Sequence, residues 1–570
     1  MRRRAFALVL LAVATIADGN AAAPAPPADL VLRNGTIVTM DPARPRVQAL
    51  AARGDTIVAV GSWSEIEPLV GPRTEVIDLQ GRLAIPGFIE GHGHFTGMGR
   101  VRLGLDLAAA RSWEEIVAMV AQAARQAAPG EWILGRGWHQ EKWASPPSPS
   151  VEGFPTHEAL SRVSPANPVL LTHASGHASF ANAKAMELAG ITRETRDPAG
   201  GQILRDVRGE PIGAFRETAD EALRRALAEA RARRTPAQVE AEERKVVELA
   251  TRECLSKGIT TFHDAGSPFT TIDLFKQLAD QGRLGIRLWV MVRDTIEAQR
   301  ANLARYRMID TGDKRLTVRA IKHSIDGALG SRGAWLLAPY ADLPGSTGLN
   351  TTPIPDIEAS ARLALEHGFQ LCVHAIGDRA NRETLDLYER AFRAYRGVKD
   401  LRWRVEHAQH LHPDDIPRFA RLGVIASMQG VHCTSDGPWV PKRLGDQRSR
   451  EGAYVWQKLL QSGALIANGT DAPVEDVSPI ASFHASVTRR LADGTAFYPD
   501  QRMTREQALR SYTLDAAYAG FQETSRGSLV AGKLADVTVL SRDILSLPED
   551  EIPGTEVVYT ILGGKIAYRK

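Results

Sequence analysis

The stretch AIPGFIEGHGHF, residues 84–95, joins a short apolar segment to two histidines separated by one residue. Alternate side chains of a β-strand point to the same face, so His92 and His94 would share a face at the end of a strand. Two imidazoles placed in this way can bind a metal ion. A polar loop tip is the alternative, and the rest of the chain has to discriminate between the two.

Seven further apolar segments resemble this first one, because each ends in a cluster of polar residues. They are ITTFHDAG, IRLWVMV, VRAIKHSIDG, FQLCVHAIGD, RWRVEHAQ, GVIASMQG and ALIANGTDAP. Helical stretches such as 355–367 and 378–395 separate several of them. Alternating strands and helices predict an α/β protein with a parallel sheet, and eight such strands predict a closed (β/α)8 TIM-like barrel.

Both ends of the chain have a different character, with short alternating strands and hairpin turns. We therefore expect residues 28–86 and 523–570 to form one small β-sandwich subdomain around a barrel domain at 87–522. Residues 95–257, between the first two barrel strands, exceed any ordinary connection and predict an inserted lid or specificity element.

Polar residues with metal-binding side chains collect at the predicted strand ends, where the chemistry of a parallel barrel is found. Taken singly, each is more simply a core histidine or a turn residue, but their coincidence favours a metal site suited to zinc. The candidates are His92, His94, Lys322, His374, His407 and Asp471. Carboxylation by CO2 would let Lys322 bridge two ions, whereas the simpler alternative is a lysine paired with Asp326 or a nearby glutamate.

Several motifs together resemble a known family. PGFIEGHGHF, GITTFHDAG, IKHSIDGALGSRGAWLLAPYAD, VHAIGDRANRETLDLYE, RVEHAQHL, IASMQ, NGTDAPVEDVSP and the terminal GSLVAGKLADVTVLSRD are similar to those of the amidohydrolase superfamily. More closely, they resemble its YtcJ-like branch, which contains N-substituted formamide deformylases. The resemblance covers about residues 28–570. Glu90 stands where aspartate is commoner, and His323-Ser324 replaces residues that are often apolar.

The resemblance implies a function and a role for each site residue. It implies a metal-dependent hydrolase that cleaves the C–N bond of a small-molecule amide with a metal-activated water. His92 and His94 would hold the more buried of two Zn²⁺ ions, His374 and His407 the second, and N6-carboxylated Lys322 would bridge them. Asp471 would complete the metal site and act as the catalytic proton shuttle. An isomerase or an ester or lactone hydrolase on the same binuclear site is the alternative.

The insertion contributes further candidates. His177 could contact the substrate carbonyl as a second catalytic residue, or simply hydrogen-bond within the lid. Trp138, Trp143 and Phe180 could offer aromatic surface to a substrate or pack within the insertion. Outside the insertion, Arg332 in GSRGAW could meet an anionic group or stabilise a loop.

The N-terminal 23 residues predict an exported protein. Three arginines precede an apolar stretch and a small-residue segment, as in a signal peptide, so we expect a periplasmic or secreted enzyme with no stable membrane span after cleavage. An uncleaved anchor is the alternative. Three cysteines do not suggest a disulfide framework, and the formal charge of +3 shows no basic, aromatic-rich run of a nucleic-acid-binding protein. The sequence leaves a homo-oligomer open.

Overall fold

The structure is a computed structural model that describes residues 26–395, 397 and 399–570. The predicted signal peptide, residues 1–23, lies outside the described residues. Within the described part of the chain, every helix is too short or too polar to cross a lipid bilayer.

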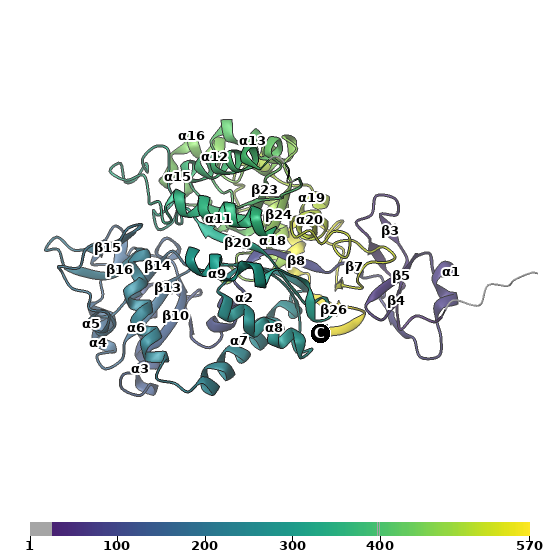
Figure 1. Cartoon of the computed structure of the whole chain (residues 1–570), viewed down its shortest axis with the longest axis horizontal. Coiled ribbons are helices and arrows are strands. Elements are labelled where there is room, and N and C mark those ends of the chain that lie inside the picture. The colour runs from purple at the N-terminus through teal and green to yellow at the C-terminus, as the bar shows by residue number, and fades with distance from the viewer. Residues whose placement is uncertain (1–25, 396, 398) are drawn as a thin grey trace, which may run out of the picture.

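Eight parallel strands form the barrel that the sequence predicts (Figure 1). In the order of the sheet they are β8 (Phe88–Gly93), β17 (Ile259–Ser267), β18 (Arg287–Val292), β20 (Leu316–Ser324), β21 (Gln370–Ala375), β22 (Arg404–His407), β23 (Ile425–Gln429) and β24 (Ile466–Gly469). The two ends of this sheet meet just past β24, where the backbone amide of Asp471 donates to the carbonyl oxygen of His92 at 2.8 Å.

Helices cover the outer face of the barrel, and this explains the composition of its strands. Strands that are buried on both faces are mostly apolar along their length, and β18, whose six residues are all buried, is apolar after Arg287. The covering helices include α8 (Phe269–Asp280), α11 (Ile354–His367), α12 (Asp378–Ala394), α13 (Ile416–Leu422) and α18 (Pro479–Thr488). Helix α11 ends where Gly368 adopts a φ of +70°, a conformation that glycine reaches without strain.

Strands from both chain ends pair with one another. Near the N-terminus, β7 (Leu83–Pro86) lies antiparallel to β25 (Val537–Leu540) in a six-stranded sheet. A second, four-stranded sheet contains β1 (Leu30–Arg33), β4 (Ala49–Arg53), β5 (Thr56–Gly61) and β6 (Glu75–Asp78). The two sheets contribute to one hydrophobic cluster. A buried ion pair, with Arg287 Nε 2.7 Å from Asp536 Oδ2, connects this cluster to the barrel.

The insertion between β8 and β17 builds a sheet of its own, which the sequence did not predict. Its six strands, in sheet order, are β15 (Gly201–Arg205), β16 (Pro211–Glu217), β14 (Ala178–Ala181), β13 (Val169–His173), β10 (Ile133–Trp138) and β9 (Leu105–Asp106). Figure 1 shows this sheet, with α3 (Trp113–Gln126) and α6 (Glu221–Arg231), on the side of the barrel opposite to β4 and β5.

Two helices carry the chain into and out of the insertion. Helix α2 (Phe95–Val101) follows His94, and α7 (Pro236–Ser256) begins with a capping box between Thr235 and Gln238. The two helices approach so closely that a Cβ atom at Gly99 would lie 2.1 Å from the Val246 carbonyl oxygen. This close contact fixes the insertion beside the strand that carries the paired histidines.

Candidate metal-binding active site

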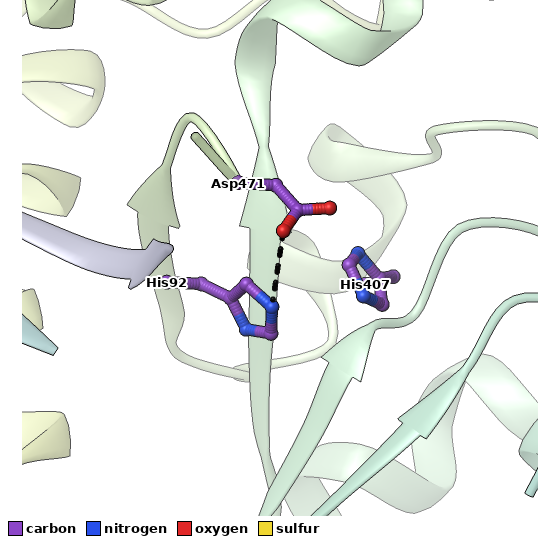
Figure 2. A group of neighbouring side chains, drawn as sticks. All are labelled: His92, His407 and Asp471. Carbon is purple, nitrogen blue, oxygen red and sulfur yellow. Dashed lines mark ion pairs between the residues drawn. The ribbon is translucent and has the colours of Figure 1, made fainter. Parts of the chain in front are cut away.

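Three of the predicted metal ligands meet at the carboxyl end of the barrel. His92 in β8, His407 in β22 and Asp471 after β24 are buried, and one ligand atom from each lies within 4.8 Å of the other two. Figure 2 shows the His92 ring and the Asp471 carboxylate facing one another, with Nε2 3.5 Å from Oδ1. The carboxyl ends of parallel strands lie on one face of a barrel, so residues that are far apart in the sequence come together there.

The other predicted histidines join the same group. His94 places Nε2 3.1 Å from Asp471 Oδ1. The ring centroid of His407 lies 4.7 Å from that of His92 and 4.5 Å from that of His374. His177 reaches the group from the insertion, with its ring centroid 4.7 Å from that of His374.

Lys322 is buried in β20. Its surroundings help to discriminate between a carboxylated, metal-bridging lysine and a structural lysine paired with a carboxylate. Burial lowers its pKa to about 8, an effect that the charge of Glu406 opposes and the charge of Arg293 reinforces. A structural lysine was expected to pair with Asp326. The carboxylate of Asp326 instead accepts hydrogen bonds from the backbone amides of Trp335, Ile376 and Gly377 at 2.8–3.0 Å. Among the described residues, Lys322 has no carboxylate oxygen within 4.0 Å of its ammonium nitrogen.

Each of three histidines in the group is tethered through Nδ1. His92 Nδ1 hydrogen-bonds to Glu406, His407 Nδ1 lies 2.7 Å from Gln429 Oε1, and His177 Nδ1 lies 2.8 Å from Glu217 Oε2. Such contacts fix the tautomer of a metal-ligating histidine and leave Nε2 free for the ion. The Nε2 atoms of His92 and His374 and the Oδ1 atom of Asp471 are buried without a hydrogen-bond partner.

The tether of His92 is itself anchored by a buried arginine. Arg404 Nε lies 2.7 Å from Glu406 Oε1, and its Nη2 donates to the Gly91 carbonyl oxygen at 2.6 Å. Burial alone would raise the pKa of Glu406, but the charge of Arg404 and the hydrogen bond with His92 hold it well below its usual range. Burial, with the charge of Lys322, lowers the pKa of His92 to about 4, so the ring is neutral and able to bind a metal.

Backbone strain is found at two of these positions. His407 has a φ of +75° and Asp471 a φ of +59°, in the left-handed region that non-glycine residues rarely adopt. Such strain persists where the surrounding structure enforces it, and it is found preferentially at functional sites. Burial opposes the ionisation of Asp471, but the nearby imidazoles, among them His94 with Nε2 3.1 Å from Oδ1, hold its pKa well below the ordinary value.

A small cavity opens beside the cluster. His177, His374, His407 and Asp471 line one side of it. The remaining wall includes residues of the insertion and of the loops after the barrel strands, namely His139, Lys142, Leu329, Gln409, His432, Asp436, Trp439 and Glu475. Residues of both the barrel and the insertion thus line the cavity.

Some site residues were not predicted from the sequence. His432, in α14 (Gly430–Asp436), is buried and places Nε2 4.0 Å from Asp471 Oδ2 without a hydrogen-bond partner. Glu406 and Arg404 were also missed, although a glutamate two residues after an arginine in the apolar stretch RWRVEH was a visible signal. Alternation places both side chains on one face of β22.

For three aromatic residues and one arginine, the sequence leaves open a structural role and a role in contacting the substrate. The structure supports the structural role for each of them. The side chains of Trp138, Trp143 and Phe180 pack in the hydrophobic core of the insertion and do not line the cavity. Arg332 stabilises loops, because it donates to the Glu152 carbonyl oxygen at 3.0 Å and pairs with Asp342 at 3.1 Å. The three cysteines are buried and free.

Comparisons with known proteins identify the family of this chain. The model of the Amidohydrolase family matches residues 75–568. The protein LONG AFTER FAR-RED 3 of Arabidopsis thaliana is 33% identical over 95% of this chain and 92% of its own length. The putative amidohydrolase YtcJ of Bacillus subtilis (strain 168) is 30% identical over 95% and 99%. The N-substituted formamide deformylase of Arthrobacter pascens is 26% identical over 95% and 98%.

Solved structures show the same fold. The crystal structure of an uncharacterised metal-dependent hydrolase from Pyrococcus horikoshii OT3 superposes with a TM-score of 0.71 and 25% identity, covering 91% of this chain and 99% of that one. The family match extends over most of the chain, and both kinds of relative that the motifs indicated align over nearly their whole length. The chain therefore belongs to the amidohydrolase family.

Proposed function

We propose that the protein is a metal-dependent hydrolase that cleaves an amide-type C–N bond of a small organic substrate. One observation carries the proposal: buried ligand atoms of His92, His407 and Asp471 lie within 4.8 Å of one another beside a cavity. The name of the deformylase relative favours an amide over other substrates.

The donor set suits two zinc ions. Neutral imidazoles and carboxylates are ligands that Zn²⁺ prefers. Cations would satisfy the buried atoms of His92, His374 and Asp471 that have no hydrogen-bond partner. We assign His92, His94 and Asp471 to one ion and His374 and His407 to the other. Lys322, carboxylated at its N6 nitrogen, would contribute an oxygen to each. Bound divalent cations supply a water of lowered pKa and polarise a substrate carbonyl.

The protein's own residues then move the proton and orient the substrate. Asp471, ionised because its pKa is held low, accepts the proton of the attacking water and delivers it to the departing nitrogen. His177 is fixed through Nδ1 by Glu217, so its Nε2 is the atom available to the substrate oxygen. Donation from Nε2 requires a proton on both ring nitrogens, and the imidazolium so formed, with Glu217 as its counter-charge, would stabilise the negative charge that develops there.

Metal content tests the proposal most directly. We expect about two zinc ions per chain in the purified protein and one or none in Lys322→Ala. Lys314→Ala is the matched control, because Lys314 is an exposed lysine paired with Asp55. One ion in both Lys322 forms would make Lys322 structural and would centre the chemistry on His92, His94 and Asp471. A metal-free protein would overturn the proposal.

The alternative reaction class uses the same residues. An isomerase, or an ester or lactone hydrolase, would also need the metals and Asp471. Assaying the metal-loaded protein on a matched panel of amides, esters and lactones separates the two. Turnover of amides with release of the amine supports the proposal, whereas turnover of lactones alone favours the alternative.

We also propose that residues 1–23 direct the protein to the periplasm or the exterior and are removed there. The arginine-rich start followed by an apolar stretch supports this. N-terminal sequencing of the protein from cell fractions tests it: a start near residue 24 in the exported fraction is expected. A full-length cytoplasmic product would contradict it. We further propose that the two terminal sheets pack as a β-sandwich around their common hydrophobic cluster.

A further inference from the structure

Helix α14 contributes two residues to the cavity wall. His432 and Asp436 both line the cavity and are four residues apart, so their side chains lie on one face of the helix, about one turn apart. His432 Nε2 lies 4.0 Å from Asp471 Oδ2, the carboxylate oxygen that Figure 2 shows turned away from His92. The helix thus places a second carboxylate in the same cavity, one turn from a residue that adjoins Asp471.

Neutral groups hold the carboxylate of Asp436 in place. Its Oδ2 atom accepts hydrogen bonds from Gln409 Nε2 at 3.1 Å and from the Tyr454 hydroxyl at 2.7 Å, and both donors belong to buried residues. Two donors on one oxygen favour the ionised carboxylate. Among the described residues, no lysine, arginine or histidine nitrogen lies within 4.0 Å of this carboxylate.

Another carboxylate of the wall shows the contrast. Glu475 Oε1 lies 3.1 Å from Lys142 Nζ and accepts a hydrogen bond from the Ser435 hydroxyl at 2.5 Å. Lys142 also lines the cavity, and this pair compensates its charge. Apart from Asp471, Asp436 is therefore the carboxylate without a counter-charge among the described residues that line the cavity.

A second observation indicates a ligand at this wall. His432 is 6% exposed, and its Nε2 atom is buried without a hydrogen-bond partner. Apolar side chains of Leu329, Ile376 and Val474 line the same cavity. A small ligand whose polar groups are joined by an apolar spacer would match both the unpartnered polar atoms and this surface.

We propose that Asp436 binds an ammonium group of the substrate, so that the natural substrate is an amide of a short diamine. An ammonium forms charge-assisted hydrogen bonds with a carboxylate, and it would supply the counter-charge that Asp436 lacks. Burial raises the pKa of this carboxyl group, and a bound cation would offset that effect. The amide would lie at Asp471 and the spacer along the turn between His432 and Asp436. The inference rests on the proposed function, which places the amide.

Binding to an inactive variant tests the inference without requiring turnover. In zinc-loaded Asp471→Asn we compare, by titration calorimetry, ligands that differ only at one end. N-formyl-1,4-diaminobutane carries an ammonium, N-formylpentylamine a methyl group and N-formyl-4-aminobutan-1-ol a hydroxyl. We expect the diamine derivative to bind about tenfold more tightly than the other two, with the preference shrinking as ionic strength rises. Equal binding of the methyl or the hydroxyl compound would overturn the inference.

Substitutions then identify the residue responsible. Adding Asp436→Asn should remove most of the preference, because the side-chain oxygen remains while the charge is lost. Asp436→Glu should keep the preference and shift it toward N-formyl-1,3-diaminopropane, because the longer side chain shortens the distance that the spacer has to cover. Asp446→Asn, which alters an exposed aspartate of α16 (Asp446–Gly452), should leave the preference unchanged. A preference that persists in Asp436→Asn would overturn the inference.

Turnover by the wild-type protein separates this inference from the proposed function. Hydrolysis of neutral formamides with no advantage from an ammonium group overturns the inference and leaves the function standing. An ammonium preference in binding, in a zinc-loaded protein that hydrolyses no amide, supports the Asp436 site and removes the proposed reaction.

Discussion

The barrel and the insertion both contribute histidines to the same site, but they hold them in different ways. His92 of the barrel is fixed from below by Glu406 and Arg404, all inside a closed ring of strands. His177 of the insertion sits after a loop and is fixed by Glu217, at the end of β16 in the same sheet. In the proposed function, the fully buried barrel histidine would hold metal and the less buried histidine of the insertion would face the substrate.

Packing supports this division. The insertion has hydrophobic clusters of its own, distinct from the large cluster of the barrel. Charged contacts join the two regions at the cavity, where Lys142 Nζ lies 3.1 Å from Glu475 Oε1 and Arg443 pairs with Glu141. A separate core allows the wall to change while the strand ends keep their geometry.

The largest effect should come from the barrel, at Asp471. In Asp471→Asn the proton acceptor is lost while an oxygen ligand remains, so we expect kcat to fall by roughly 10²–10⁴ with most of the bound metal retained. Steady-state kinetics and metal analysis on the same sample check this. Loss of both metal and activity in proportion would instead give Asp471 a purely ligating role.

A smaller effect on metal binding should follow the loss of the barrel tether. In Glu406→Gln the amide keeps the shape of the carboxylate but removes the negative charge that Arg404 pairs with. We therefore expect zinc affinity to fall by roughly 10- to 100-fold. Competition with a chromophoric chelator measures it. An unchanged affinity would show that Glu406 serves only the barrel core.

The corresponding substitution in the insertion tests whether its histidine is held independently of the metal centre. Glu217→Gln removes the carboxylate tether of His177, and we expect zinc affinity to be unchanged while kcat/KM falls by about tenfold, as when one positioning hydrogen bond is lost. If Glu217→Gln also released zinc, the insertion would belong to the metal centre and the division between the regions would fail.

The smallest effect concerns acid stability of the barrel. Burial lowers the pKa of His410 to about 3, far below its unfolded value of about 6.5. Between these values the unfolded chain binds the extra proton, so the free energy of unfolding falls as pH decreases below about 6.5. At pH 5.5 this loss is about 1.4 kcal/mol for this residue.

Denaturant unfolding at pH 7.5 and 5.5 checks the acid effect. His410→Gln should lose less stability over this interval than the wild-type protein. His412→Gln alters an exposed histidine close by and serves as the matched control. The same acid sensitivity in wild type and His410→Gln would contradict the assignment.

The sequence predicts the barrel well for a physical reason. Each strand is an apolar run that ends in polar residues, and the closed parallel sheet then brings those ends together without further information. Lys322, His374 and Asp471 could therefore be placed near His92 from the amino-acid sequence alone. The insertion was harder, because its short strands pair out of sequence order, β14 with β16 and β10 with β13.

The supporting contacts could not be predicted in the same way. A charge in an apolar strand signals a buried partner, but Glu406 meets His92 across 314 residues, and no local pattern specifies that partner. His432 was missed because it follows β23 on a short helix rather than ending a strand. The insertion aromatics were ambiguous, since a cavity wall and a hydrophobic core use the same side chains.

The pairing of β7 with β25 has a consequence for how the chain is made. The strand that leads into the first barrel strand needs a partner that follows all eight barrel strands in the chain, and Asp536, just before that partner, neutralises the buried Arg287. A truncated product ending before residue 536 would keep every candidate metal ligand yet leave an arginine uncompensated and a sheet edge open. Nascent chains would thus expose this edge until β25 has been made.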